Sequence, residues 1–568
     1  MHIKALYLLS PMLALSLGAA GVRFEQSAKV VDRFDFVEVT LTVSNPPAGN
    51  PFMDTEVAGE FVREGDAGPL HVDGFCDSED GSKFRIRFMP MDAGKHTYSV
   101  IYRRTDDQQR HTGSFTARAG RRKGMVRVDK EHPTHFVWAG TGEHFFYNST
   151  TAYWLLAFTD EGVIRDSIDR LARLKVNRIR SALSGRTTGG MRWKEPMIVS
   201  DDAFQFRLEP WPAARPRDIH NPGYDVTRFN LEHFRKTERM LAHARNRDLI
   251  VSLIFALDVA DKGVDPFGVK SSTGNADEQR YYRYCVARFA AFANVWWDLI
   301  NEWNLCREEA WVEKMGALVK KWDPYDHVAS VHGTSRFPFG KQAWVDYVMF
   351  QSWDEHGAYD FMLKARQAQS AANRPLPIIN EEYGYEDHYP HPWGEKRIWP
   401  ARIAETRVRL AWEMTMAGGY QTTGERANIA AMGGWITGRG NDEMTMLEGY
   451  ARMRAFFEKF EWWKLEPHPE LVSAESKALP VAEGSKSLAP ALCLAQPGER
   501  YVTYLRQGGT ATVKLAPGRY AVRRFNPRTA EYQKVAPAID TPWTTPPVPD
   551  TEPWAFIIER AELGPSRK

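Results

Sequence analysis

Cysteine is scarce in this chain. Only four cysteines occur among 568 residues, at Cys76, Cys285, Cys306 and Cys493, and none belongs to a C-x-x-C pair. Structural zinc sites and disulfide-rich scaffolds need more, or more closely spaced, cysteines, so neither is predicted. One disulfide bond would be compatible with the sequence, which does not select its partners.

Long apolar runs are also rare, and the one exception lies at the N-terminus. A lysine at position 4, an apolar run from Ala5 to Leu17 and small residues at 18–21 are typical of a secretory signal peptide, which we assign to residues 1–21. The alternative is an uncleaved membrane anchor, for which the run is barely long enough. We therefore expect an exported protein, periplasmic or extracellular, with no membrane attachment after cleavage.

Neither sign of charge dominates the sequence. Lys and Arg number 74 and Asp and Glu 72, which gives a formal net charge of +2 without a basic block. Nucleic-acid-binding proteins gather basic residues on one surface, so no nucleic-acid partner is expected. The motifs G-x-S-x-G and H-E-x-x-H and the phosphate loop are absent too, which removes three common catalytic or nucleotide-binding signatures.

What is present suggests several domains. Residues 24–117 alternate short β-rich runs with turn clusters, a pattern that favours a β-sandwich. The pattern changes after the basic linker 121–124, and strand signals return beyond a stretch rich in Pro and Ser at 467–490. We predict an N-terminal β-sandwich at 22–120, a catalytic barrel at 121–463 and a C-terminal β-domain at 464–568.

The middle region alternates short apolar strands with long amphipathic stretches, which is typical of βα units. Eight such units predict a central (β/α)8 TIM barrel, flanked in this multidomain chain by the N-terminal β-sandwich and the C-terminal all-β domain. A doubly wound open sheet is the alternative, but no glycine-rich phosphate turn follows the first strand. The predicted strands are 145–150, 176–183, 249–256, 295–302, 328–333, 347–353, 378–383 and 418–423, and the predicted helices include 164–174, 228–247, 278–292 and 402–416.

Two glutamates end predicted barrel strands. Glu302 follows the apolar run of strand four, and Glu382 follows that of strand seven. Barrel enzymes place their reactive groups at the C-terminal ends of the strands, and strands four and seven lie across the barrel mouth from each other. Hydrolysis of a glycosidic bond with retention needs one protonated and one ionised carboxyl, about 5 to 5.5 Å apart. Trp296, Trp303 and nearby apolar surface are candidates for keeping the acid protonated.

With these strand ends the sequence resembles the clan A glycoside hydrolases, in which Asn-Glu ends strand four and a glutamate ends strand seven. The resemblance implies that Glu302 is the acid/base and that Glu382, in Glu-Tyr-Gly, is the nucleophile of a retaining enzyme. The order of sandwich, linker and barrel resembles poorly characterised bacterial apiosidase-like and cellulase-like families over nearly the whole chain. Those families act on several substrates.

Two features depart from the clan pattern. Strand six ends Gln351-Ser352-Trp353, without the tyrosine that often touches the nucleophile, and strand seven carries Glu381 directly before Glu382. Because side chains alternate along a strand, we expect only one of these glutamates to point into the site. The Glu-Tyr-Gly match favours Glu382, with Glu381 as the competitor.

Other polar and aromatic residues near strand ends are predicted to bind the sugar. Asn148 lies in an Asn-Ser-Thr glycosylation sequon, but its expected place at the end of the first barrel strand favours the pocket over a surface glycan. For His332 a structural role is as well supported as a substrate contact. The loop 386–391 holds Glu, Asp and His without a known zinc spacing, so lining the cleft is favoured over metal binding. The predicted substrate-binding residues are Asn148, Arg180, Asn301, His332, Gln351, Trp353, Tyr383, Glu425 and Trp435.

The predicted function is therefore hydrolysis of a glycosidic bond in a poly- or oligosaccharide by double displacement, with a carbohydrate as the partner and no cofactor or metal. The same residues would serve a transglycosylase. A barrel that binds glycans without cleaving them is a further alternative. The sequence selects neither the sugar and its linkage, nor exo or endo action, nor an oligomeric state.

Overall fold

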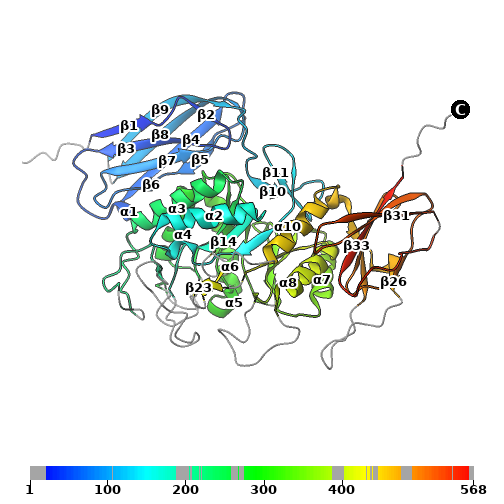
Figure 1. The fold of residues 1–568 in the computed structure, drawn as a ribbon. Coiled ribbons are helices and arrows are strands. Elements are labelled where there is room, and N and C mark those ends of the chain that lie inside the picture. Colours follow the sequence, from blue (N-terminus) through cyan, green and yellow to red (C-terminus); the bar gives the residue numbers. More distant parts are fainter. Residues whose placement is uncertain are drawn as a thin grey trace, which may run out of the picture.

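The structure is a computed structural model, and it places a β-sandwich, a β/α barrel and a second β-domain in chain order (Figure 1). The predicted signal peptide lies outside the described residues except for Gly21, and within the described part no helix is long and apolar enough to cross a membrane. The structure describes residues 21–104, 107–186, 204, 207–216, 218, 221–257, 266–267, 274–334, 336–386, 402–425, 427–429, 432–434, 438, 446–474, 489–539 and 541–561.

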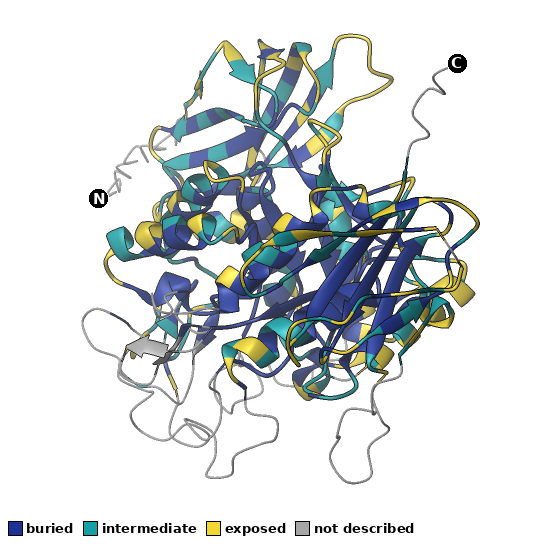
Figure 2. Cartoon of the chain, turned by 45° about the vertical axis from the view of Figure 1, so that its right-hand side comes forward, coloured by how far each residue is buried: buried dark blue, intermediate teal, exposed yellow. Residues whose placement is uncertain are grey.

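The N-terminal domain is built from two sheets, in the orders β1-β3-β7-β6 and β2-β9-β8-β4-β5. Strand β3 alternates buried and half-buried residues, so one face of its sheet packs into the domain core, and Figure 2 shows such banding across the domain. Its elements are β1 (Val22–Gln26), β2 (Val30–Asp32), β3 (Val37–Val43), α1 (Pro51–Asp54), β4 (Thr55–Arg63), β5 (Leu70–Asp73), β6 (Phe75–Cys76), β7 (Lys83–Phe88), β8 (Gly94–Arg104) and β9 (Asp107–Arg118).

Eight parallel strands form the barrel that the sequence predicts. Their order is β19-β18-β17-β14-β13-β22-β21-β20, and a parallel bridge between Gly333 and Phe350 joins the last strand back to the first. The predicted fold class is confirmed, and each predicted strand overlaps one barrel strand. The strands are β13 (Ser149–Thr151), β14 (Arg178–Ala182), β17 (Ile250–Ile254), β18 (Val295–Asp298), β19 (Ala329–Ser330), β20 (Val348–Gln351), β21 (Ile378–Glu382) and β22 (Tyr420–Thr423).

The first predicted strand needs a correction, because residues 145–150 belong to two different sheets. Phe145 ends β12 (His144–Phe145), which pairs with β11 (Phe136–Trp138), and β11 pairs in turn with β10 (Val126–Val128). The barrel strand begins only at Ser149. Phe136 of β11 packs on Trp296 of β18, with ring centroids 5.0 Å apart, so this small sheet packs against barrel-strand side chains.

The barrel helices begin where polar side chains cap them. Asp160, Asn230 and Asn275 accept hydrogen bonds from backbone N–H groups in the first turns of α2, α3 and α4. The helices are α2 (Glu161–Arg173), α3 (Leu231–Arg245), α4 (Ala276–Phe289), α5 (Trp303–Cys306), α6 (Glu309–Trp322), α7 (Ala358–Ala371), α8 (Ala404–Met416) and α10 (Met446–Phe457). Single 3-10 turns lie at Leu155–Ala157, Trp462–Lys464 and Pro469–Leu471. Two short strand pairs are β15 (Gly185–Arg186) with β16 (Arg207–Leu208) and β23 (Ala427–Ile429) with β24 (Met432–Gly433).

The C-terminal β-domain packs on the barrel beside α7, α8 and α10 (Figure 1). Trp412 of α8 stacks on Tyr504 with ring centroids 5.1 Å apart, and Arg506 forms an ion pair with the buried Glu413. The strands of the C-terminal β-domain are β25 (Glu466–Pro467), β26 (Val472–Ala474), β27 (Ala491–Gln496), β28 (Arg500–Leu505), β29 (Ala511–Val513), β30 (Tyr520–Phe525), β31 (Tyr532–Ala538), β32 (Trp543–Thr544) and β33 (Trp554–Arg560).

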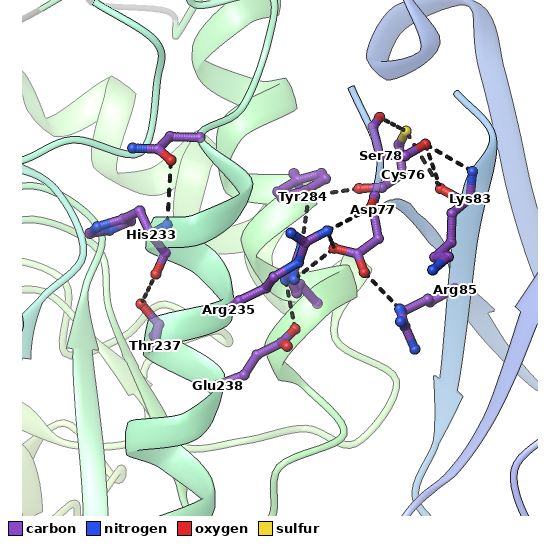
Figure 3. Close-up of polar contacts among 12 residues, drawn as sticks. Cys76, Asp77, Ser78, Lys83, Arg85, His233, Arg235, Thr237, Glu238 and Tyr284 are labelled. Carbon is purple, nitrogen blue, oxygen red and sulfur yellow. Dashed lines mark hydrogen bonds and ion pairs between the residues drawn. The ribbon is translucent and has the colours of Figure 1, made fainter. Parts of the chain in front are cut away.

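A buried ionic network joins the sandwich to helices α3 and α4 of the barrel, and Figure 3 shows it around Asp77. The Asp77 carboxylate contacts Arg85 of β7 at 2.7 Å and Arg288 of α4 at 3.0 Å, while Arg288 also contacts Glu238 of α3 at 2.6 Å. Burial by itself would raise the pKa of Asp77, but Arg288, Arg85 and Arg235 outweigh it and lower that pKa. The charges buried between the sandwich and the barrel are therefore compensated within this interface.

None of the four cysteines, all of which lie in described parts of the chain, forms a disulfide bond. All four are buried. The fold is thus held by packing, hydrogen bonds and ion pairs.

Candidate active site

Glu382, the last residue of β21, lies among hydrogen-bond donors at the C-terminal end of the barrel. Its Oε2 accepts a hydrogen bond from the Tyr153 hydroxyl at 2.9 Å, and its Oε1 accepts one from Nε2 of Gln351 at 3.1 Å. Tyr153 follows β13, and Gln351 ends β20. Only 6% of Glu382 is exposed, so these neutral donors replace the water that would otherwise solvate its carboxylate.

Arg180 of β14 organises the neighbouring side chains. Its Nε donates to Oδ2 of Asp298 at 2.7 Å, its Nη1 donates to the Tyr153 hydroxyl at 3.0 Å, and its Nη2 donates to Oδ1 of Asn301 at 3.1 Å. Tyr385 donates from its hydroxyl to that of Tyr153 at 3.2 Å. Tyr153 thus accepts from Arg180 and donates to Glu382, which orients the carboxylate.

The electrostatic surroundings shift two carboxyls of this group. Burial and the nearby charge of Glu302 raise the pKa of Glu382 to about 7, although Tyr385, Arg180 and Tyr153 act in the opposite direction. Burial also raises the pKa of Asp298 to about 6, despite its ion pair with Arg180. Both carboxyls therefore hold their protons more tightly than in water, and Glu382 responds directly to the charge of Glu302.

Glu302 stands at the turn between β18 and the short helix α5. Its backbone is left-handed, with φ 48° and ψ 51°, and its N–H donates to Nδ1 of His332 at 3.3 Å. Glu302 is half-buried, whereas Trp303 beside it is fully buried. The turn therefore gives the glutamate, but not the tryptophan, access to solvent.

Glu381 occupies a separate group deeper in the barrel. Its Oε2 accepts from Nη1 of Arg178 at 2.7 Å and its Oε1 accepts from the Tyr147 hydroxyl at 3.1 Å, and no part of Glu381 is exposed. We call Arg178, Glu381 and Tyr147 the lower group, and Arg180, Tyr153, Glu382 and Gln351 the upper group.

A bulge explains how adjacent glutamates on β21 contact residues of the same barrel interior. Phe350 pairs with Asn380, but the next residue of β20, Gln351, pairs with Glu382, so the register shifts by one residue there. Arg178 and Arg180 are two apart on β14 and lie on the same face of that strand, and each reaches one of the two groups. Both glutamates therefore contact residues of the barrel interior, and of the two only Glu382 contacts the upper group.

Three residues predicted to bind substrate lie elsewhere. Asn148 precedes β13 instead of ending a strand, and its side chain donates to the carbonyl of Lys175 at the opposite end of the barrel. Tyr383 points outward, because its hydroxyl donates to the carbonyl of Arg407 in α8 at 3.0 Å. Glu425 forms a buried, bidentate ion pair with Arg170 of α2. All three are corrected to structural positions.

The remaining predicted residues divide into those near Glu382, one behind Glu302 and one outside the described chain. Arg180, Asn301 and Gln351 belong to the contacts given above, and Trp353 packs edge-on to Tyr385 with centroids 5.5 Å apart. His332 is fully buried against the backbone of Glu302, which corrects its prediction as a sugar contact. Trp435 lies outside the described residues, as do positions 387–391 of the loop weighed as a metal site.

Sequence reasoning missed Tyr153, Tyr385 and Asp298. The tyrosine expected from strand six is absent, and Tyr153, from the segment after strand one, touches the nucleophile candidate in its place. In the sequence, Asp298 is an acidic residue among the tryptophans and aliphatic residues of a predicted strand, and this pattern indicates a buried ion pair. In the described part of the chain no three His, Cys, Asp or Glu side chains gather as a metal site would require.

Comparisons with known proteins find similarity over the same part of the chain. Residues 196–425 match the family of apiosidase-like catalytic domains, a span that includes both Glu302 and Glu382. This part of the barrel is similar to that family. The predicted resemblance to apiosidase-like hydrolases and the predicted enzyme class, glycoside hydrolase, are thereby confirmed.

The rest of the chain is matched through its fold. Residues 30–103, in the sandwich, match a domain of unknown function, DUF5060. A protein from Bacteroides vulgatus named as a candidate glycoside hydrolase is 20% identical, with a TM-score of 0.72 over 94% of this chain and 100% of that one. A family 5 glycoside hydrolase from the same species is 12% identical, with a TM-score of 0.58 over 77% and 93%.

A search of curated proteins finds no match. The two structural likenesses establish the architecture of the chain.

Proposed function

We propose that the apiosidase-like domain is a retaining glycoside hydrolase that cleaves a glycosidic bond of a poly- or oligosaccharide, with Glu382 as nucleophile and Glu302 as acid/base. In the first step an Oε atom of Glu382 attacks the anomeric carbon while Glu302 gives its proton to the leaving oxygen. In the second step Glu302 takes a proton from water, and the water oxygen displaces Glu382.

The observation that carries the proposal is the asymmetry between the two carboxyls. Tyr153 and Gln351 both donate hydrogen bonds to Glu382, and Arg180 in turn donates to Tyr153. These donors stabilise the anionic form of the Glu382 carboxyl in place of water. The mutual repulsion of Glu302 and Glu382 disfavours a double anion. The pair therefore resists carrying two negative charges, and these donors stabilise the anion of Glu382 when it ionises to attack.

Neighbouring residues would bind the sugar. Asn301 is held by Arg180 beside the two carboxyls, and Trp353 offers a half-exposed ring next to Tyr385. A flat ring beside the reacting carboxyls suits packing against the apolar face of a sugar. We assign Asn301 and Trp353, together with Arg180 and Gln351, to the substrate site.

The domain limits and the export of the protein belong to the same proposal. We keep 22–120, 121–463 and 464–568 as the three domains and residues 1–21 as a signal peptide, with action in the periplasm or outside the cell. The site is proposed to work without a cofactor.

The experiment that tests the function uses a panel of plant, algal and microbial polysaccharides together with aryl glycosides, β-D-apiosides among them because of the family match. The anomer first released is read by proton NMR. Net retention is expected, and first release of the opposite anomer would contradict the mechanism.

Azide rescue assigns the two roles. With an activated aryl glycoside, Glu302→Ala plus azide should form a glycosyl azide of retained configuration, and Glu382→Ala plus azide one of inverted configuration. The reverse pattern would exchange the roles. Glu381→Ala is the matched control, and it should form neither product.

A further inference from the structure

The backbone of Glu302 is held in an unusual conformation. A residue other than glycine rarely adopts φ 48° and ψ 51°, and such a residue persists where its surroundings fix it, at a cost of about 1–3 kcal/mol. Helix α5, which follows, has only four residues and cannot impose this geometry by itself. The constraint must come from a neighbouring element.

The segment after β19 supplies that constraint through four hydrogen bonds. Nδ1 of His332 accepts from the Glu302 N–H at 3.3 Å, and the His332 carbonyl accepts from the Trp303 N–H at 2.9 Å. Two residues further on, Asn304 and Thr334 bond reciprocally, at 2.9 Å from Nδ2 to Oγ1 and at 3.0 Å from the Thr334 N–H to Oδ1. The bond to Nδ1 is the one that acts on Glu302 itself.

The imidazole of His332 is suited to accept a hydrogen bond. Burial lowers the pKa of His332 well below its ordinary value, and the positive charges of Arg180 and Arg178 lower it further, so the ring stays neutral. A neutral imidazole has one bare nitrogen, and the contact with a backbone N–H identifies it as Nδ1. A protonated ring would present a donor to a donor and lose this contact.

We propose that His332 is a positioning residue for the acid/base: its Nδ1 fixes the left-handed backbone of Glu302 and thereby aims the Glu302 carboxyl at the leaving oxygen. His332 touches neither sugar nor nucleophile in this role. The inference rests on the proposed function, because it assigns to Glu302 the protonation step.

The test compares His332→Asn with His332→Leu, two side chains of similar size. The amide oxygen of asparagine can replace Nδ1 as the acceptor, and leucine cannot. The substrates are phenyl and 2,4-dinitrophenyl glycosides of the sugar and anomeric form that the wild-type enzyme accepts. Dinitrophenolate leaves without help from an acid, whereas phenolate requires protonation, so the ratio of the two kcat/KM values isolates the work of Glu302.

We expect His332→Leu to lose about 100-fold in kcat/KM on the phenyl glycoside, as a misplaced catalytic group does, and less than about 5-fold on the dinitrophenyl glycoside. His332→Asn should stay within about 5-fold of wild type on both. Equal losses on the two substrates, or equal behaviour of the two variants, would overturn the positioning role.

Glu302→Gln separates this inference from the function on which it rests. It should show the same leaving-group selectivity as His332→Leu, only larger, and the double variant should lose little beyond Glu302→Gln. If Glu302→Gln itself shows no selectivity, the proposed function fails. If it does and His332→Leu does not, only the role of His332 fails.

Discussion

The two neighbouring glutamates of β21 experience different electrostatic surroundings. Glu381, in the lower group, faces the full charge of Arg178 at 2.7 Å and a tyrosine hydroxyl. Glu382, in the upper group, faces neutral donors, while the nearest guanidinium, that of Arg180, forms its ion pair with Asp298. The charge of Glu381 is therefore neutralised by Arg178, whereas Glu382 is oriented by its hydrogen bonds without being neutralised.

This difference teaches which buried acid is suited to chemistry. A carboxylate locked to a guanidinium loses nucleophilicity, and breaking such a pair leaves an uncompensated charge in the core. A carboxyl that is buried, hydrogen-bonded and close to a second acid has a shifted pKa and stays reactive. The lower group is expected to govern stability and the upper group turnover, and the predictions below test that division.

The largest expected effect is on turnover in the upper group. Glu382→Gln should lower kcat/KM by about 1,000-fold or more, because the amide cannot form the glycosyl intermediate. Aryl glycoside hydrolysis measures the loss, and circular dichroism checks that the variant is folded. A folded variant that keeps a tenth of the activity would remove Glu382 from the mechanism.

The next effect belongs to the lower group and is one of stability. Glu381→Gln should lower the free energy of unfolding of the barrel by about 3–5 kcal/mol, because Arg178 is left buried without its counter-charge. Urea denaturation at pH 7 measures it, and Glu381→Gln combined with Arg178→Met should recover part of the loss. Unchanged stability together with lost turnover would reverse the two groups.

A smaller effect is expected from the hydroxyl that orients Glu382. Tyr153→Phe removes one hydrogen bond to a charged group, worth about 1.5–3 kcal/mol, so kcat should fall by roughly 10- to 100-fold. Tyr383→Phe is the matched control, because that hydroxyl points toward α8, and its kcat should change by less than about 2-fold. Equal effects would show that the direction of the hydroxyl does not matter.

The last expected effect is the only one that depends on pH, and it concerns stability. The pKa of Glu382 is about 7 in the folded chain and 4.5 is its ordinary value, so the folded state binds the proton more tightly between these pH values. Stability contributed by this proton is present below pH 4.5 and is lost as pH rises to 7.

Glu382→Gln removes this dependence. The variant should be more stable than wild type at pH 8 by an amount on the order of 3 kcal/mol, and the difference should vanish near pH 4. Thermal unfolding across pH measures it, with the exposed Glu64→Gln as control. A gain that persists at pH 4 would point to a cause other than titration.

Most of the barrel could be predicted from the sequence because βα rhythm is a local property. Largely apolar runs such as 250–254 and 295–297 lie in buried strands, and the amphipathic stretch around Leu231–Arg245 is a helix, as periodicity indicates. The first strand failed because residues 144–151 contain no glycine or proline, so no strong turn signal marks the break between β12 and β13. That error moved Asn148 to the wrong end of the barrel.

The environment of the site residues could be predicted only in part. Glu302 and Glu382 stand out as acids after apolar runs, but the partners of Glu382 come from segments about 230 and 30 residues away, at Tyr153 and Gln351. The outward turn of Tyr383 and the pairing of Glu425 with Arg170 depend equally on which helix packs behind each strand. Such partners are set by packing between distant segments, which periodicity does not encode.

The sequence by itself determined the barrel, its flanking β-domains and the two acids at strand ends, because periodicity and the order of residues along a strand are local. Only the tertiary structure decided what surrounds each acid. A one-residue bulge beside Gln351 separates Glu381 from Glu382, and the approach of Arg178, Arg180 and Tyr153 gives one a counter-charge and the other a set of donors. Reactivity follows from those surroundings, because the free energy of a buried charge depends on the groups that replace its water.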